Sequence, residues 1–186
     1  MTGWTTPLTA GTHLAPEDGT CLMEAVSLVT GDRWTDSPTS THPLLAHLAR
    51  RVNDTVADDI RPDLTAFIPD LIATNRHDPL DHARIALACA EYASALGNSP
   101  VLAHLQQRAI RRLATDSRAD SPNTGLRHVA RIARRWEFEH GPARQAVEVA
   151  VAQCSKHGDV NLIRLLEVGT TAIGSRHIPE SFSCRG

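Results

Sequence analysis

Residues 81–96 read DHARIALACAEYASAL, and apolar or small side chains occupy most positions on every side of this stretch. A helix that is apolar nearly all round is buried by several neighbours, so we expect 81–96 to be the central helix of the protein. Glu91 is the charged exception inside it. Because Arg84 lies two helical turns earlier on the same side, we expect these two side chains to share a narrow polar strip, rather than Glu91 to act as a catalytic acid.

Helical spacing of apolar residues continues on both sides of 81–96, and no stretch alternates with a period of two, so no sheet is expected. Pro69 interrupts the pattern and predicts a kink or two short helices there. The predicted fold is all-α, with seven or eight helices in a single domain, either an irregular orthogonal bundle or a short array of helical hairpins. The expected helices cover 16–30, 43–56, 64–72, 81–96, 100–115, 125–139, 142–156 and 159–173. One core is expected to contain Leu45, Leu48, Leu87, Leu102, Leu105 and Val147.

Two of these expected helices are similar in sequence. Pro43–Asp59 (PLLAHLARRVNDTVADD) and Pro100–Asp116 (PVLAHLQQRAIRRLATD) are identical at 8 of 17 positions. The match indicates either a duplicated helical hairpin or the chance similarity of helices rich in alanine and leucine. His47 and His104 are equivalent in this alignment, and we expect both to be half-exposed packing residues rather than metal ligands.

Composition bounds the class of protein. With 186 residues, 41% of them apolar and 22% charged, the chain suffices for one compact domain, expected over 16–178 and including the possible duplicated hairpins 16–59 and 81–116. Residues 1–15 lack periodicity and are expected to form a flexible arm, with 179–186 as a tail. No run approaches the roughly 18 apolar residues of a membrane span, and the start of the chain has no signal core, so a cytoplasmic protein is expected. Structural disulfides are not expected, because the cysteines lie far apart, at 21, 89, 154 and 184.

Charge is unevenly distributed along the chain. Residues 1–100 hold 13 acidic residues and 6 arginines, a net charge of −7, whereas residues 101–186 hold 13 basic and 8 acidic residues, a net charge of +5. Halves of opposite sign attract each other within one molecule or between two, or the basic half binds an acidic partner. Arginines at helical spacing form two candidate partner-binding faces: Arg127, Arg131, Arg134 and Arg135 on one helix, and Arg108, Arg111 and Arg112 on another.

Arginine faces of this kind also neutralise the phosphates of nucleic acids. Three observations disfavour that function here: the net charge is −2, the chain has a single lysine, and only 4% of its residues are aromatic, which leaves little for stacking on bases. The sequence also contains no phosphate-binding loop, no GxGxxG and no GxSxG.

The stretch from Pro16 to Asp54 contains a specific pattern, PEDGTCLMEA at 16–25, followed by Gly31, the TDSP of 35–38 and Asn53–Asp54. It resembles a family of small uncharacterised actinobacterial proteins, some of them phage-borne, whose N-terminal motif reads PEDGxCLMEA. The resemblance covers the first part of the chain only and implies no particular activity. Some members carry cysteines near positions 40 and 42, where this chain has Ser40 and His42, which weakens any metal site inferred from the family.

Within this motif, Glu17, Cys21 and Glu24 share one face if the helix begins at or before Glu17. With His42 folded back from the loop 32–42, this face is a candidate catalytic pocket, in which Cys21, Glu24 and His42 are the catalytic residues. A Glu/Cys/His metal site is a further alternative. The nearby carboxylates oppose a thiolate and offset the effect of a helix N-terminus, so we expect Cys21 to be an ordinary thiol at the edge of the core. The histidines show no HExxH or similar spacing, and no metal or cofactor is expected.

The sequence therefore predicts a non-catalytic helical interaction or regulatory module. It would bind a protein partner, or a second copy of itself, through an arginine face or through the groove between repeats, with no membrane involved. A small enzyme built on the Cys21 pocket is the second hypothesis and DNA binding is the third. The first two differ in a measurable way: an interaction module tolerates Cys21→Ala, whereas this enzyme does not.

Overall fold

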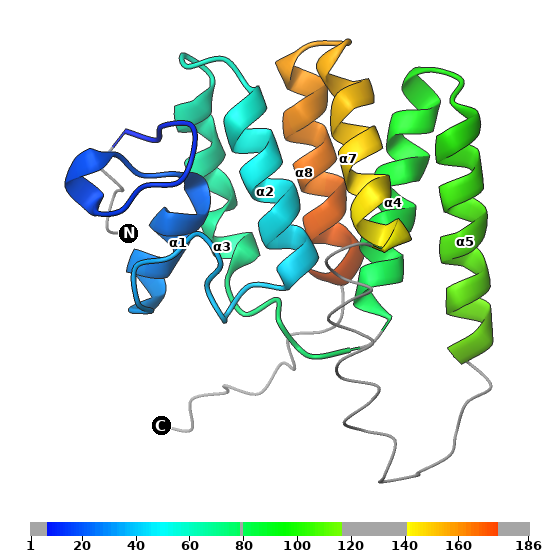
Figure 1. Cartoon of the computed structure of the whole chain (residues 1–186), viewed down its shortest axis with the longest axis horizontal. Helices are drawn as coiled ribbons and strands as arrows, with labels where there is room; N and C mark the ends of the chain where they lie inside the picture. Colours follow the sequence, from blue (N-terminus) through cyan, green and yellow to red (C-terminus); the bar gives the residue numbers. More distant parts are fainter. Residues whose placement is uncertain (1–6, 79, 117–140, 175–186) are drawn as a thin grey trace, which may run out of the picture.

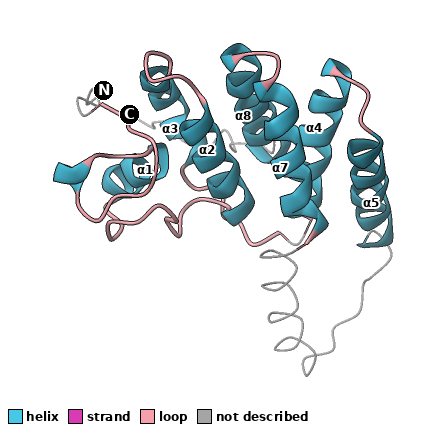
Figure 2. Ribbon diagram, turned by 45° about the horizontal axis from the view of Figure 1, so that its top comes forward, coloured by secondary structure: helices cyan, strands magenta, loops and turns pink. Residues whose placement is uncertain are grey.

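The structure, a computed structural model of the full chain, describes residues 7–78, 80–116 and 141–174. Within these ranges it contains seven α-helices, two short 3-10 helices and no strand (Figure 1, Figure 2), which confirms the predicted all-α fold. None of these helices is long and apolar enough to cross a membrane. The elements are η1 (Pro16–Asp18), α1 (Leu22–Thr30), α2 (Pro43–Thr55), η2 (Arg61–Phe67), α3 (Ile68–Leu71), α4 (Asp81–Leu96), α5 (Pro100–Asp116), α7 (Pro142–Ser155) and α8 (Asp159–Gly174).

Three expectations lie outside the described residues. These are the first six residues of the expected arm, the tail over 179–186, and the helix over 125–139. The last of them carries the first arginine face, which consists of Arg127, Arg131, Arg134 and Arg135.

Pro69 produces the predicted break in the helical pattern. The 3-10 helix η2 ends at Phe67, and α3, a single turn that contains Pro69, follows directly. The buried side chains Leu64 and Leu71 hold the two short elements against the core.

Figure 1 shows the main helices side by side in a row, with α5 at one end and α1 and α3 at the other. The predicted central helix α4 packs against α5, α7 and α8. Its residues Ile85, Cys89 and Ala93 are fully buried, because neighbours cover more than one side of the helix.

One stripe of α4 faces the solvent. Arg84 and Leu87 on this stripe are half-buried, and Glu91 is exposed. The prediction that Leu87 lies in the core was therefore wrong. The Arg84 guanidinium lies 2.6 Å from Oδ2 of Asp78 and 2.7 Å from Oδ1 of Asp81, so it donates to carboxylates near the start of α4 rather than to Glu91.

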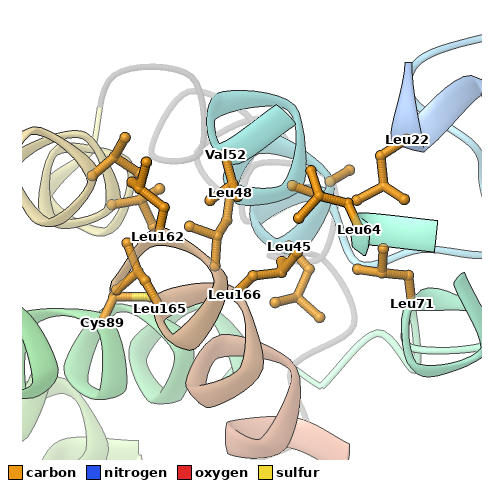
Figure 3. Packing of buried hydrophobic residues seen from close by; sticks show 14 of the residues in the cluster. Leu22, Leu45, Leu48, Val52, Leu64, Leu71, Cys89, Leu162, Leu165 and Leu166 are labelled. Carbon is orange, nitrogen blue, oxygen red and sulfur yellow. The ribbon is translucent and has the colours of Figure 1, made fainter. Parts of the chain in front are cut away.

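The hairpin of α7 and α8 lies between α2 and α4 (Figure 1). Helix α8 approaches α2 closely at Gly169, where a Cβ atom would come within 2.5 Å of Cδ2 of Leu48 and 3.7 Å of Sγ of Cys89. Figure 3 shows Leu48 and Leu165 of α8 in one apolar cluster. The two similar hairpins therefore do not stack directly on each other, and α7 and α8 occupy the space expected as a groove between repeats.

The two similar helices, α2 and α5, differ in how they are covered. Leu48 and its equivalent Leu105 are both buried, but Leu105 packs with Ala86 and Ala146 in a separate small cluster, so the prediction that it shares one core with Leu48 was wrong. His47 is also buried and bonds through Nε2 to Oε1 of Glu148 on α7 at 2.8 Å, whereas its equivalent His104 is exposed. The expectation of two half-exposed histidines was wrong, because α2 has neighbours on both sides and α5 lies at the end of the row.

Candidate functional site

Cys21 and Glu24 of the motif form the N-terminus of α1. Cys21 is the N-cap residue, and its Sγ accepts a hydrogen bond from the backbone N of Glu24 at 3.5 Å. In return, Oε2 of Glu24 accepts one from the backbone N of Cys21 at 2.8 Å. This capping box satisfies two donors that the start of a helix otherwise leaves open. Because α1 begins only at Leu22 and Gly19 ends the preceding 3-10 turn, Glu17 does not share this helix face.

His13, which the sequence did not single out, is the other partner of Glu24. Its backbone N donates to Oε1 at 2.7 Å, and its ring Nδ1 lies 2.8 Å from Oε2. The second ring nitrogen, Nε2, lies 3.0 Å from Oγ1 of Thr9. The Glu24 side chain is 0% exposed and that of His13 is 12% exposed, so this contact is almost entirely shielded from water. Thr9, His13 and Glu24 together are termed the clasp.

The clasp holds residues 7–15, which were expected to belong to a flexible arm. Nδ2 of Asn53 donates to the carbonyl oxygen of Thr9 at 2.8 Å, and the backbone N of Gly11 donates to Oδ1 of Asp54 at 2.8 Å. The segment is therefore packed on α1 and α2. Its contacts to α2 are made by Asn53 and Asp54, the last two residues of the sequence pattern.

A carboxylate, an imidazole and a hydroxyl in the order of the clasp also occur in hydrolase triads, where the imidazole activates the hydroxyl. Here Oγ1 of Thr9 also accepts a hydrogen bond from the backbone N of Thr20 at 2.9 Å. Gly19 covers the pair, since a Cβ atom there would come within 2.6 Å of Oγ1 of Thr9 and 2.7 Å of Nε2 of His13. The chain's own backbone encloses the hydroxyl, so the clasp braces the N-terminal segment instead of presenting a nucleophile.

The candidate catalytic residues Cys21 and His42 lie near opposite ends of α2. The backbone N of Leu22 donates to Oδ1 of Asn53, close to the C-terminus of α2, at 3.2 Å. His42 is the N-cap of the same helix, and a rise of 1.5 Å per residue places it about 16 Å from Asn53. The structure therefore does not bring together the pocket expected from Glu17, Cys21, Glu24 and His42.

The thiol of Cys21 is buried, and its environment disfavours a thiolate. Burial, together with the Glu24 charge, raises the pKa of Cys21 to about 12. Burial also raises the pKa of Cys89 to about 12 and that of Cys154 to about 11. All three thiols are free and buried, as expected for small core residues, and a protonated thiol is a poor nucleophile at neutral pH.

His42 serves as the cap of α2. Its Nδ1 accepts a hydrogen bond from the backbone N of Leu44 at 3.3 Å, and its ring meets that of His82 edge to face, with centroids 4.5 Å apart. Burial, followed by the charge of His82, lowers the pKa of His42 to about 3, so the ring is neutral at physiological pH. In the ranges that the structure describes, no group of three or more His, Cys, Asp or Glu side chains is arranged to hold a metal ion.

The outward side of α5 carries the second predicted arginine face. Five exposed residues follow each other at helical spacing along it, and they are termed the α5 face: Val101, His104, Arg108, Arg111 and Arg112. None of the ion pairs between described residues includes these arginines. The opposite side of the helix packs inward through Leu102, Leu105 and Ala109.

No protein-family model, curated protein or solved structure matches this chain. The function is therefore inferred from the clasp, the capping residues and the α5 face alone. Of these three features, only the α5 face offers charged side chains to another molecule.

Proposed function

We propose that this protein is a non-catalytic helical interaction module of the cytoplasm, and that the α5 face docks a protein partner with an acidic surface. One observation carries the proposal: Arg108, Arg111 and Arg112 are exposed next to each other with no acidic partner among the described residues. Neighbouring guanidinium groups without a countercharge attract carboxylates and steer an acidic partner toward this helix.

The position of α5 makes its outward side available. The helix contacts α4 and α7 and lies at the end of the row of helices (Figure 1). Among the described elements, none packs on the side that carries the arginines. The arginines on this side are therefore open to another molecule in the part of the chain that the structure describes.

The composition of the α5 face suits contact with a protein. Arginine is enriched in protein interfaces and lysine is depleted, because the planar guanidinium forms paired hydrogen bonds with carboxylates and packs on apolar groups. Val101, which is 48% exposed, adds an apolar contact at one end of the same stripe. The α5 face therefore combines charged groups that attract carboxylates with one apolar side chain that a partner can cover.

The enzyme hypothesis has less support. Its nucleophile, Cys21, is a buried thiol with a raised pKa, and His42 caps the far end of α2. The nucleic-acid hypothesis uses the same three arginines, so the experiment must distinguish a protein partner from DNA or RNA.

Arginine footprinting with phenylglyoxal, read by mass spectrometry, tests the proposal. We expect Arg108, Arg111 and Arg112 to be less reactive in cells than in dilute purified protein at high salt. Arg33 is exposed and belongs to none of the ion pairs between described residues, so it is the matched control and keeps the same reactivity. The same footprinting is then carried out on a lysate of these cells, with and without nuclease. If the partner is a protein, nuclease leaves the protection of the three arginines unchanged. Equal reactivity of the three arginines in both samples would overturn the proposal, and protection lost with nuclease would assign the face to nucleic acid.

A further inference from the structure

We propose that the α5 face of one molecule docks onto the acidic surface at the other end of a second copy of this chain, so that molecules associate head to tail. This inference rests on the proposed function, because it names the acidic partner of the α5 face. The complementary charge of the two ends of one molecule carries it.

The acidic surface lies on η2, on α3 and on the turn before them. Asp59, Asp63, Ala66 and Asp70 are exposed. Asp63 and Ala66 share one side of η2, because side chains three residues apart eclipse each other in a 3-10 helix, and Asp59 and Asp70 precede and follow them in the sequence. Leu64 of η2 and Leu71 of α3 are buried in the core. The three carboxylates take part in none of the ion pairs between described residues. These four exposed residues are termed the acidic end.

The acidic end and the α5 face lie at opposite ends of the row of helices. Figure 1 and Figure 2 both show α3 and α5 with α2, α8, α7 and α4 between them. Two surfaces this far apart cannot neutralise each other within one molecule, and none of the other described elements covers either of them, so each can contact another copy. Among the described residues, the three arginines of the α5 face and the three carboxylates of the acidic end thus lie apart in space.

The two surfaces also match in chemical composition. Three carboxylates at the acidic end face three guanidinium groups on the α5 face, and each surface adds apolar groups. The apolar group of the α5 face is Val101, and those of the acidic end are Ala66 and the exposed rings of Pro62 and Pro69. A single exposed ion pair contributes little, but several pairs around a dry contact form a specific interface.

The contact joins two different surfaces, so it produces head-to-tail chains rather than a closed symmetric dimer. A symmetric dimer uses the same patch on both molecules, whereas this contact leaves one free α5 face and one free acidic end on every dimer. Association therefore continues beyond the dimer as concentration rises. It weakens with salt, because the charges are exposed and the screening length is about 8 Å at physiological ionic strength.

Sedimentation velocity of the full chain and of two neutralised variants tests the inference. One variant carries Arg108→Gln, Arg111→Gln and Arg112→Gln, and the other carries Asp59→Asn, Asp63→Asn and Asp70→Asn. At low salt, we expect the average mass of the wild type to rise with concentration and to return to that of a monomer at high salt. Each variant alone stays monomeric. An equimolar mixture of the two forms one heterodimer and nothing larger, because only one competent α5 face and one competent acidic end remain.

A matched control separates this contact from a general effect of charge. Arg33→Gln, Lys156→Gln and Arg164→Gln remove the same charge from exposed positions outside both surfaces and leave self-association unchanged. A wild type that stays monomeric at low salt and high concentration, or a mixture that forms no heterodimer, would overturn the inference. If the footprinting nevertheless shows protection of the α5 face in cells, the proposed function stands and its partner is a different acidic protein.

Discussion

Nδ1 of His13 lies 2.8 Å from Oε2 of the buried Glu24, and this contact joins the N-terminal segment to the first turn of α1 across the intervening η1 turn. The same carboxylate also accepts a hydrogen bond from the backbone of Cys21. One side chain thus fixes both the start of the helix and the segment packed against it. Gly19 lacks a Cβ atom and so permits the close approach of the backbone to the His13 ring. His13, Gly19, Cys21 and Glu24 therefore stabilise the N-terminal region together.

Removing the His13 ring tests this role. His13→Ala leaves the buried Glu24 carboxylate with backbone donors only, and we expect the free energy of unfolding to fall by about 1.5 to 3 kcal/mol. Urea denaturation measures the change. His104→Ala, at an exposed histidine of α5, is the matched control and should change stability by less than about 0.5 kcal/mol. Equal effects of the two substitutions would mean that the clasp does not stabilise the fold.

The reactivity of Cys21 tests whether its thiol is structural. Burial raises the pKa of Cys21 to about 12, so we expect its alkylation by iodoacetamide to stay slow at pH 7 and to accelerate only in the alkaline range. Mass spectrometry of the alkylated peptides follows this thiol without replacing the others, and the urea-unfolded protein provides the rate of a free thiol. We expect His42→Ala to leave the rate at Cys21 unchanged. An inflection below pH 7 that this substitution removes would restore the catalytic pair.

The pH dependence of stability tests the buried state of His42. Its pKa is about 3 in the folded protein and about 6.5 in the unfolded chain, so the unfolded state takes up the proton first as the pH falls. Its contribution to stability is therefore complete above pH 6.5 and is lost as the pH falls toward 3. His42→Asn keeps a side-chain acceptor at the N-cap but does not titrate.

The comparison with His42→Asn isolates this one group. Between pH 6 and 4, the free energy of unfolding of the wild type should fall about 1.4 kcal/mol per pH unit more steeply than that of the variant. The carboxylates titrate in both proteins, so their effect cancels in the difference. Parallel pH profiles would show that His42 is protonated as easily in the folded protein as in the unfolded chain.

Gly169 tests the close contact between α8 and α2. In the wild type, Gly169→Ala brings a methyl group against the packed Leu48 side chain. The strain, about 2 kcal/mol, outweighs the gain in helix propensity of about 1 kcal/mol, so we expect a net loss of stability. In a Leu48→Ala background the same substitution fills part of a cavity and should stabilise the protein. The same sign of effect in both backgrounds would contradict this packing.

The helices were predictable because their apolar residues repeat at helical spacing, and the break at Pro69 follows from the chemistry of proline. The burial of Leu45 and Leu102 follows from the same pattern. Leu87 was misplaced because α4 is not covered on every side, and its composition of small residues conceals the stripe that faces solvent. A single sequence contains no direct record of how many neighbours a helix has.

The clasp was not predictable in the same way. His13 and Glu24 meet across η1 and Gly19, and no periodic pattern connects residues on two separate elements. One local signal was available: Cys21 followed three residues later by Glu24 resembles the capping box S/T-x-x-E, and it places the start of the helix at Leu22 rather than near Glu17. The buried position of His47 depends on α7, a helix that begins about a hundred residues later.

Site-specific photo-crosslinking in cells tests whether the outward side of α5 contacts another protein. A photoreactive residue at Gln107, which is exposed beside Arg108 and Arg111, should give a covalent protein adduct. The same residue at Ala152, an exposed position on α7, should give none, and changing the three arginines of the α5 face to glutamine should abolish the adduct at Gln107. An adduct of twice the chain mass identifies a second copy, and any other protein mass identifies a different partner. Failure to form an adduct at Gln107, or an adduct of equal yield without the arginines, would contradict the proposed contact.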